Sequence, residues 1–206
     1  MLLNDKLGDC TIAGALHLIQ LFCAVTGKPF TPDNNMALAA YESICGYNPN
    51  DPNTDTGGVL LNVLNAWQKV GIAGHKIDAF ALVDVHNETE VKQAISLFGG
   101  LYTGKDLPIA AQTEDIWWDP SPNDGGLWGG HCTPDMDYDE GTGPDAAGPG
   151  LDLITWAAVK RETWAFFQRY TIEAYVVIDF DFLEASGVSP SGLTMDQLRA
   201  DLALIR

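Results

Sequence analysis

Basic residues are scarce in this sequence. Its 206 residues include only 11 Lys and Arg against 28 Asp and Glu, which gives a formal net charge of −17 at pH 7. Nucleic acids and anionic membranes both bind surfaces rich in Lys and Arg, so we expect neither as a partner. The acidic excess is typical either of a solvated surface suited to high salt or of a preference for a basic substrate or partner.

Long apolar runs are also missing. No run approaches the about 18 apolar residues of a membrane-spanning helix, and the N-terminus lacks the basic region and apolar block of a signal peptide. We therefore expect a soluble, cytoplasmic protein. Hydrophobic residues still make up 46% of the chain, and this argues for a folded core and against disorder.

Cysteine is sparse, and the spacing of the four cysteines excludes two further classes of protein. They form no CxxC pair and no metal-finger pattern, and they are too few for a disulfide scaffold. Cys23 and Cys45 fall in apolar helical patterns and are expected to be buried thiols. His17, seven residues after Cys10, is better explained as a core residue than as half of a metal pair. We expect no metal and no cofactor.

Hydrophobic periodicity, caps and turn residues place the expected elements. Helices are expected from residue 10 to the end signal at 27–29, and over 31–45, 59–70, 87–98, 157–169 and 194–205. Strands are expected over 76–83, 101–105, 131–138, 151–156 and 170–180. Between them lie a long irregular stretch at 107–130 and an acidic hairpin insertion at 139–150. Acidic residues alternate at positions 135, 137 and 139, which fits a solvated strand face better than a calcium loop.

Helices come first in this order and most strands come later. That order is typical of an α+β fold in which a helical lobe packs against a mostly antiparallel sheet. We expect a single domain with a helical lobe over roughly 1–75, a β-rich lobe over roughly 76–180 and a C-terminal extension over 181–206. A cleft between the two lobes would hold residues from both.

One cysteine stands where a Gly-Asp turn becomes an apolar helical segment. Asp9 is a good N-cap residue, so Cys10 is expected at the first position of a buried helix. Free backbone N–H groups and the helix dipole favour a thiolate there. The charge of Asp9 opposes this effect, so the thiol needs a cationic partner. His131, which opens a strand in the other half of the chain, is the candidate.

Several segments occur in the order typical of the papain-like cysteine peptidases, and the sequence resembles that family up to about residue 180. Asn4 stands six residues before Cys10, where the family usually has a Gln that serves as oxyanion donor. Gly57-Gly58 and the amphipathic helix after them resemble the Gly-Gly segment and second helix of the family. Gly129-Gly130-His131 and the extended run after it resemble the strand that carries the catalytic histidine.

The segment Ile154-Thr155-Trp156 resembles the Asn-Ser-Trp-Gly motif of the family and differs at one important position. Trp156 matches the tryptophan that shields the catalytic site, whereas Ile154 stands where the family has the Asn that orients the histidine. Thr155 orients His131 if the register shifts by one residue. Asp152, on the same strand face as Ile154, is the alternative.

The resemblance implies a thiol hydrolase that acts on a peptide or amide bond of a peptide or protein substrate. Cys10 would be the nucleophile, paired as a thiolate with the imidazolium of His131. Asn4 and the backbone N–H of Cys10 would stabilise the oxyanion, and Thr155 would orient the histidine. Two alternatives stay open: an inactive papain-like binding or structural module within a larger protein assembly, and an acyl-transfer enzyme that uses the same pair.

Overall fold

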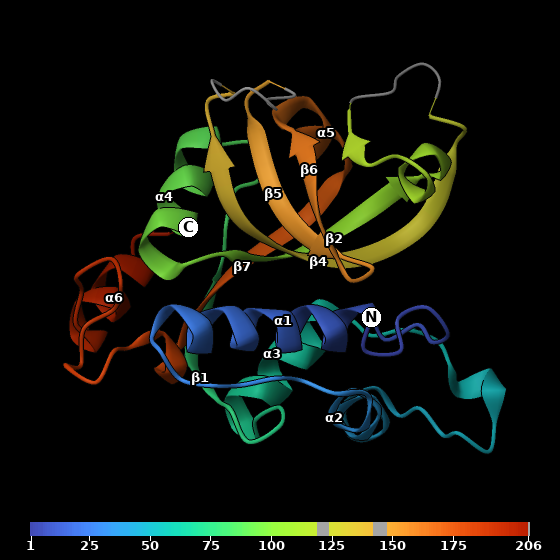
Figure 1. The fold of residues 1–206 in the computed structure, drawn as a ribbon, viewed down its shortest axis with the longest axis horizontal. Coiled ribbons are helices and arrows are strands. Elements are labelled where there is room, and N and C mark those ends of the chain that lie inside the picture. Colours follow the sequence, from blue (N-terminus) through green and yellow to red (C-terminus); the bar gives the residue numbers. More distant parts are fainter. Residues whose placement is uncertain (119–123, 142–147, 206) are drawn as a thin grey trace.

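The structure is a computed structural model that describes residues 1–118, 124–141 and 148–205. It confirms the α+β class: within the described residues, six α-helices accompany a seven-stranded, mostly antiparallel open sheet (Figure 1). Parts of two expected segments, the irregular stretch and the acidic insertion, lie outside the described residues. The lobe bounds stay a prediction.

Most elements lie where hydrophobic periodicity predicts them. The α-helices are α1 (Cys10–Val25), α2 (Asn34–Ala40), α3 (Leu60–Lys69), α4 (Glu88–Phe98), α5 (Trp164–Tyr170) and α6 (Met195–Leu202). A short π-helix, η1 (Tyr41–Cys45), extends α2. The 3-10 turns are η2 (Pro52–Thr54), η3 (Ile109–Gln112) and η4 (Phe180–Phe182). The strands are β1 (Ile77–Leu82), β2 (Leu101–Pro108), β3 (Ile116–Trp117), β4 (Leu127–Asp139), β5 (Gly150–Thr155), β6 (Ala158–Thr163) and β7 (Thr171–Asp179).

The strand order across the sheet is β1-β7-β2-β4-β5-β6-β3. Neighbouring strands are antiparallel except β3 and β6, which pair in parallel. β4 therefore lies in the middle of the sheet, between β2 and β5. The register of β2 and β4 places Lys105 opposite His131, so the histidine lies on a central strand and not at an edge.

The sheet separates two hydrophobic layers. In Figure 1, α1, α2 and α3 lie below the curved sheet, whereas α5 lies on its opposite face and α4 flanks it. Leu101 packs in the layer that contains α4, and its neighbour Tyr102 packs in the layer that contains α1. This alternation follows because successive strand residues point to opposite faces.

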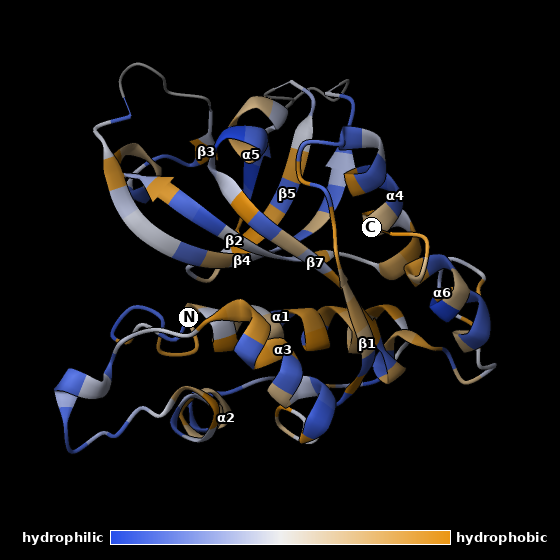
Figure 2. Ribbon diagram, turned by 180° about the vertical axis from the view of Figure 1, so that it is seen from behind, coloured by the Kyte–Doolittle hydropathy of each residue, from blue (hydrophilic) through white to orange (hydrophobic). Residues whose placement is uncertain are grey.

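Helix α1 is buried by the sheet on one side and by α2 and α3 on the other. Figure 2 shows it hydrophobic along most of its length, and a helix that is apolar all round is expected to be buried. Gly14 lets it approach β4 closely, because a Cβ there would lie 3.1 Å from the Sγ of Cys132. The Tyr102 hydroxyl also donates a hydrogen bond to the Thr11 carbonyl at 2.8 Å.

The expected helix over 157–169 is wrong in its first half. β5 and β6 form a tight hairpin there, in which Thr155 pairs with Ala158, and α5 begins only at Trp164. Trp156 and Ala157 form the turn with φ of 46° and 61°. Two-residue hairpin turns of this kind usually carry Gly or Asn, which tolerate positive φ. The sequence has neither at these positions, so the turn could not be recognised.

The stretch at 107–130 is more regular than expected. β2 continues to Pro108, η3 follows, β3 pairs with β6 and β4 already begins at Leu127. The indole of Trp117 is fully buried and donates to the Ala111 carbonyl at 2.9 Å. These pieces are too short to show a hydrophobic period, which is why the sequence did not predict them.

Two helix starts show different uses of the N-cap position. Thr194 and Gln197 form the expected capping box of α6, with both reciprocal hydrogen bonds present. Asp9 occupies the N-cap position of α1, but its side chain caps nothing in the helix. Its Oδ1 instead accepts from the amide of Asn4 at 3.2 Å, so the capping role predicted for Asp9 is wrong.

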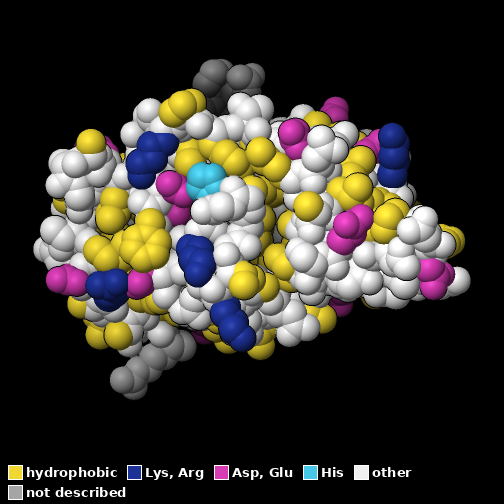
Figure 3. Space-filling view, turned by 90° about the horizontal axis from the view of Figure 1, so that it is seen from below, with side chains coloured by type: hydrophobic (Ala, Val, Ile, Leu, Met, Phe, Trp, Pro, Cys, Tyr) yellow, Lys and Arg dark blue, Asp and Glu magenta, His cyan; other side chains and the backbone are white. Residues whose placement is uncertain are grey.

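The face that carries the helices mixes hydrophobic patches with charged side chains of both signs (Figure 3). None of the described helices combines the length and the apolar character needed to cross a membrane. The cytoplasmic location stays a prediction.

Candidate active site

Cys10 is the first residue of α1, as its place after the Gly-Asp turn predicts. Its side chain is partly buried and lines a cleft of about 690 Å³, within the usual size of ligand sites. His131, from the central strand β4, lines the same cleft. Its other walls include Ile44, Gly57, Gly58, Leu60, Gly104 and Glu173.

The four residues predicted for the site come together in space. Asn4, Cys10, His131 and Thr155 all line one small cavity of about 10 Å³, which shares Cys10 and His131 with the cleft. They arrive from four segments: the N-terminal loop, the start of α1, β4 and the end of β5. The pairing of β4 with β5 and the packing of α1 on β4 bring these segments together.

The imidazole of His131 is held on two sides. Its Nε2 lies 2.8 Å from Thr155 Oγ1, and its ring stacks on Trp156 with the centroids 4.9 Å apart. Asp152, the alternative orienting residue, instead accepts a hydrogen bond from Arg161 at 3.2 Å. The structure thus places Thr155 beside the histidine and engages Asp152 elsewhere.

Burial dominates the electrostatics of Cys10. It raises the pKa of the thiol above its usual value of 9.0, and the charge of Asp9 adds to the rise. The backbone N–H groups of Cys132, Thr11 and Cys10 itself act in the opposite direction. The start of the helix therefore favours the thiolate as expected, but burial outweighs it.

Burial also controls His131, which is only 6% exposed. It lowers the pKa of the imidazole to about 4, and the positive charge of Lys105 on the neighbouring strand contributes. Lys105 belongs to a fully buried charged cluster, in which its Nζ lies 3.0 Å from Asp135, 2.7 Å from Glu162 and 3.2 Å from the Thr171 hydroxyl. We call these four residues the Lys105 cluster.

The two shifts together favour a neutral thiol beside a neutral imidazole at pH 7. The sequence instead predicts a thiolate beside an imidazolium. The difference arises because both side chains are buried, and burial penalises the charged form of each. A buried lysine next to the histidine strand adds a further penalty to the imidazolium.

Asn4 already uses its amide. Its Nδ2 donates to Asp9 Oδ1 at 3.2 Å and to the Leu7 carbonyl at 3.4 Å. The second contact is long and weak. Asp9 is fully buried, and burial raises its pKa to about 7.

Gly58 allows the wall of the cleft to lie close to α1. A Cβ at this position would lie 2.4 Å from Thr11 Oγ1 and 2.8 Å from Cys45 Sγ. Only glycine fits, so the Gly-Gly segment that resembles the papain-like pattern has a steric reason in this fold. It places backbone, and no side chain, along the cleft beside Cys10.

The Lys105 cluster was missed by sequence reasoning. The one available signal was a lysine within a short apolar strand, Leu101 to Lys105, since lysine is almost never fully buried without a partner. Its carboxylate partners, Asp135 and Glu162, lie on two other strands. Nothing in the chain order relates these positions.

A comparison of the sequence with models of known protein families finds no match, and a comparison with curated proteins finds none either.

Proposed function

We propose that this protein is a papain-like thiol hydrolase that cleaves a peptide or amide bond. The observation that carries the proposal is the small cavity shared by Asn4, Cys10, His131 and Thr155. A cysteine at a helix start, a histidine on a central strand and an open cleft beside both are the parts that acyl transfer to a thiol requires.

The first step would be attack of Cys10 Sγ on the substrate carbonyl carbon. Because both groups are neutral at rest, His131 takes the thiol proton as the new S–C bond forms. Negative charge then develops on the carbonyl oxygen, and the backbone N–H of Cys10 and the amide of Asn4 stabilise it. Thr155 acts as a positioning residue, since it holds Nε2 and leaves Nδ1 for this proton.

The tetrahedral intermediate would collapse by breaking its C–N bond. His131 returns the proton to the leaving amine, and the acyl group stays on Cys10 as a thioester. Water then attacks the thioester carbonyl while His131 accepts a proton from it. The C–S bond then breaks, His131 returns this proton to the sulfur of Cys10, and the carboxylic acid leaves.

A second candidate is a papain-like module that binds a protein partner without cleaving it. The observation that favours it is the electrostatics of the pair, since burial raises the pKa of Cys10 and lowers that of His131. The same cleft would then bind a peptide segment without chemistry at the thiol.

Turnover and thiol reactivity, measured on the same samples, separate the two candidates. The full chain, Cys10→Ser and His131→Ala are incubated with a pool of unfolded proteins, and new N-termini are identified by mass spectrometry. Alkylation by iodoacetamide is followed over a pH range by peptide mapping. The thiols of Cys23, Cys45 and Cys132 serve as internal references.

Cleavage by the parent that is lost in both variants supports the hydrolase. Cleavage by none of the three, together with Cys10 alkylation that does not depend on His131, contradicts it and leaves the binding module. If Cys10 reacts below pH 7 only when His131 is present, the ion pair predicted from the sequence forms in solution.

A further inference from the structure

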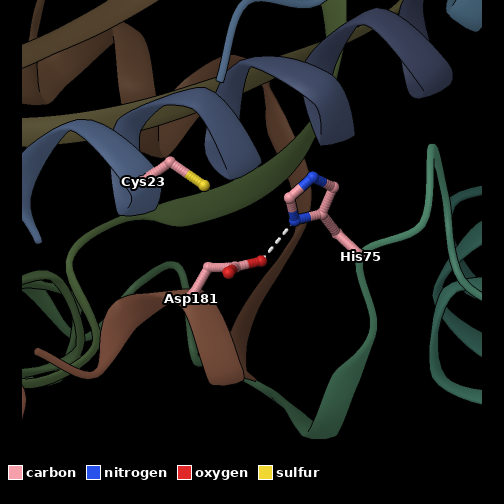
Figure 4. A group of neighbouring side chains, drawn as sticks. All are labelled: Cys23, His75 and Asp181. Atoms are coloured by element: carbon pink, nitrogen blue, oxygen red, sulfur yellow. Dashed lines mark hydrogen bonds and ion pairs between the residues drawn. The ribbon is translucent and has the colours of Figure 1, made fainter. Parts of the chain in front are cut away.

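A second group of polar side chains lies away from the cleft, on the far part of α1. Cys23 comes from the last turns of α1, His75 from the loop between α3 and β1, and Asp181 from η4 after β7. Figure 4 shows the Cys23 thiol and the Asp181 carboxylate converging on the His75 ring. One possible ligand atom from each residue lies within 4.8 Å of the other two.

The backbone holds His75 and Asp181 firmly in these positions. His75 and Ile72 exchange two backbone hydrogen bonds, at 2.8 and 2.9 Å, and the His75 ring packs edge-on against Phe30. The carbonyl of Asp181 accepts a hydrogen bond from Thr26 Oγ1 at 2.8 Å, which ties η4 to the end of α1. The imidazole Nδ1 of His75 is hydrogen-bonded to Asp181 Oδ2.

The surroundings of Cys23 are negative. Burial raises the pKa of its thiol to about 11, and the charges of Asp181 and Asp179 add to the rise, while Lys28 opposes it. Asp179 is fully buried: its Oδ1 accepts from the Asp181 N–H at 2.7 Å, and its Oδ2 is left without a hydrogen-bond partner. A buried carboxyl oxygen without a partner is costly.

We propose that Cys23, His75 and Asp181 bind a divalent transition-metal ion of the zinc type. One thiolate, one imidazole and one carboxylate form a donor set that suits Zn²⁺ and disfavours Ca²⁺ and Mg²⁺, which prefer oxygen alone. On binding, the thiol loses its proton and the metal replaces the hydrogen bond between His75 and Asp181. The side chains of His75 and Asp181 are 21% and 22% exposed, so water can fill the fourth position.

Cys23 is only 2% exposed, so the ion would face solvent on the side of His75 and Asp181. The ion would join three segments that lie far apart in the sequence: the end of α1, the loop before β1 and the turn after β7. The proposal does not depend on hydrolase activity, because Cys10 is not among the ligands.

Cobalt serves as the probe, because Co²⁺ bound to a thiolate gives a charge-transfer absorption band that water or carboxylate ligands do not give. The titration uses the full chain with Cys10→Ser, which removes the thiol of the cleft. We expect one equivalent of Co²⁺ to bind with a thiolate band, and Zn²⁺ to displace it. The band should disappear when Cys23→Ser is added.

His75→Gln and Asp181→Asn, each in the Cys10→Ser background, should weaken binding at least about tenfold. The matched controls are Cys45→Ser and His17→Gln, which should leave the titration unchanged. Because His75 is partly exposed, its variant decides the matter if Cys23→Ser fails to fold. The proposal is overturned if no thiolate band develops, or if the band survives the loss of Cys23 or is unaffected by His75→Gln.

Discussion

The Nε2 of His131 lies 2.8 Å from the hydroxyl of Thr155. A hydroxyl can accept from Nε2–H as an amide oxygen does. Under the proposed function, Nδ1 then keeps its lone pair for the proton of Cys10. Thr155 on β5 is therefore the residue that faces the other ring nitrogen of the histidine.

Thr155→Val removes this hydroxyl and keeps the shape of the side chain. We expect labelling of Cys10 by a peptide electrophile to slow by about tenfold, the value of one hydrogen bond. Thr155→Ser should restore the parent rate. The ¹⁵N resonances of His131 report the tautomer directly. An unchanged tautomer in Thr155→Val would contradict a positioning role, even if the rate fell.

Asp9→Asn should change the pH dependence of stability. In the unfolded chain this carboxyl loses its proton near pH 4, whereas burial in the folded protein raises its pKa to about 7. The folded state therefore holds the extra proton between these values, and the contribution of Asp9 to the free energy of unfolding falls as the pH rises from 4 through 7. The asparagine variant avoids this loss.

The measurement is the free energy of unfolding in urea at pH 4 and pH 8. The change in the free energy of unfolding caused by Asp9→Asn should be more stabilising at pH 8 than at pH 4 by about 2 to 4 kcal/mol. Comparing the effect at the two pH values cancels any contribution of altered packing to the free energy of unfolding, because that contribution does not depend on pH. An equal effect at both pH values would show that Asp9 carries its charge in the folded state without cost.

Two substitutions in the Lys105 cluster should differ in their effect on the free energy of unfolding. Lys105→Met leaves the buried carboxyl groups of Asp135 and Glu162 without their cation, and should cost about 3 kcal/mol or more. Burial raises the pKa of Glu162, and the nearby charge of Asp135 adds to the rise. Glu162→Gln, which keeps a neutral side chain of the same shape, should cost less than about 1 kcal/mol at pH 7. Urea unfolding tests both, and equal losses would contradict the raised pKa of Glu162.

A glycine in the turn between β5 and β6 is expected to stabilise the protein. Ala157 is exposed and has a φ of 61°, where a Cβ is strained. Ala157→Gly should raise the free energy of unfolding by about 1 kcal/mol. Ala158→Gly, at the next and equally exposed position in β6, is the control and should lower it. Destabilisation by both would show that the turn strain is absent in solution.

Helix α1 and strand β4 could be predicted because their signals are local. Apolar spacing from Ile12 to Cys23 and the extended run after His131 define these elements without help from the rest of the chain. The position of Cys10 at the start of α1 could be predicted as well, because the Gly-Asp turn before it is a local signal. The resemblance in motif order then paired it with His131.

The errors have long-range causes. The hairpin at Trp156 and Ala157 is held by packing, since the Trp156 indole stacks on His131 and contacts Trp117 edge-on. The charge state of the pair depends on Lys105, which only the sheet register places beside His131. Burial decides which form of each group is stable, and burial is a property of the assembled fold.

The close approach of Gly14 to Cys132 has a consequence for the order of folding. Cys10 begins the first helix and His131 lies past the middle of the chain, so the helix can dock only after β4 has joined the sheet. Closing so long a loop is entropically costly and comes late. A chain synthesised only as far as α1 would hold Cys10 without His131, and the two residues would meet only after β4 has joined the sheet.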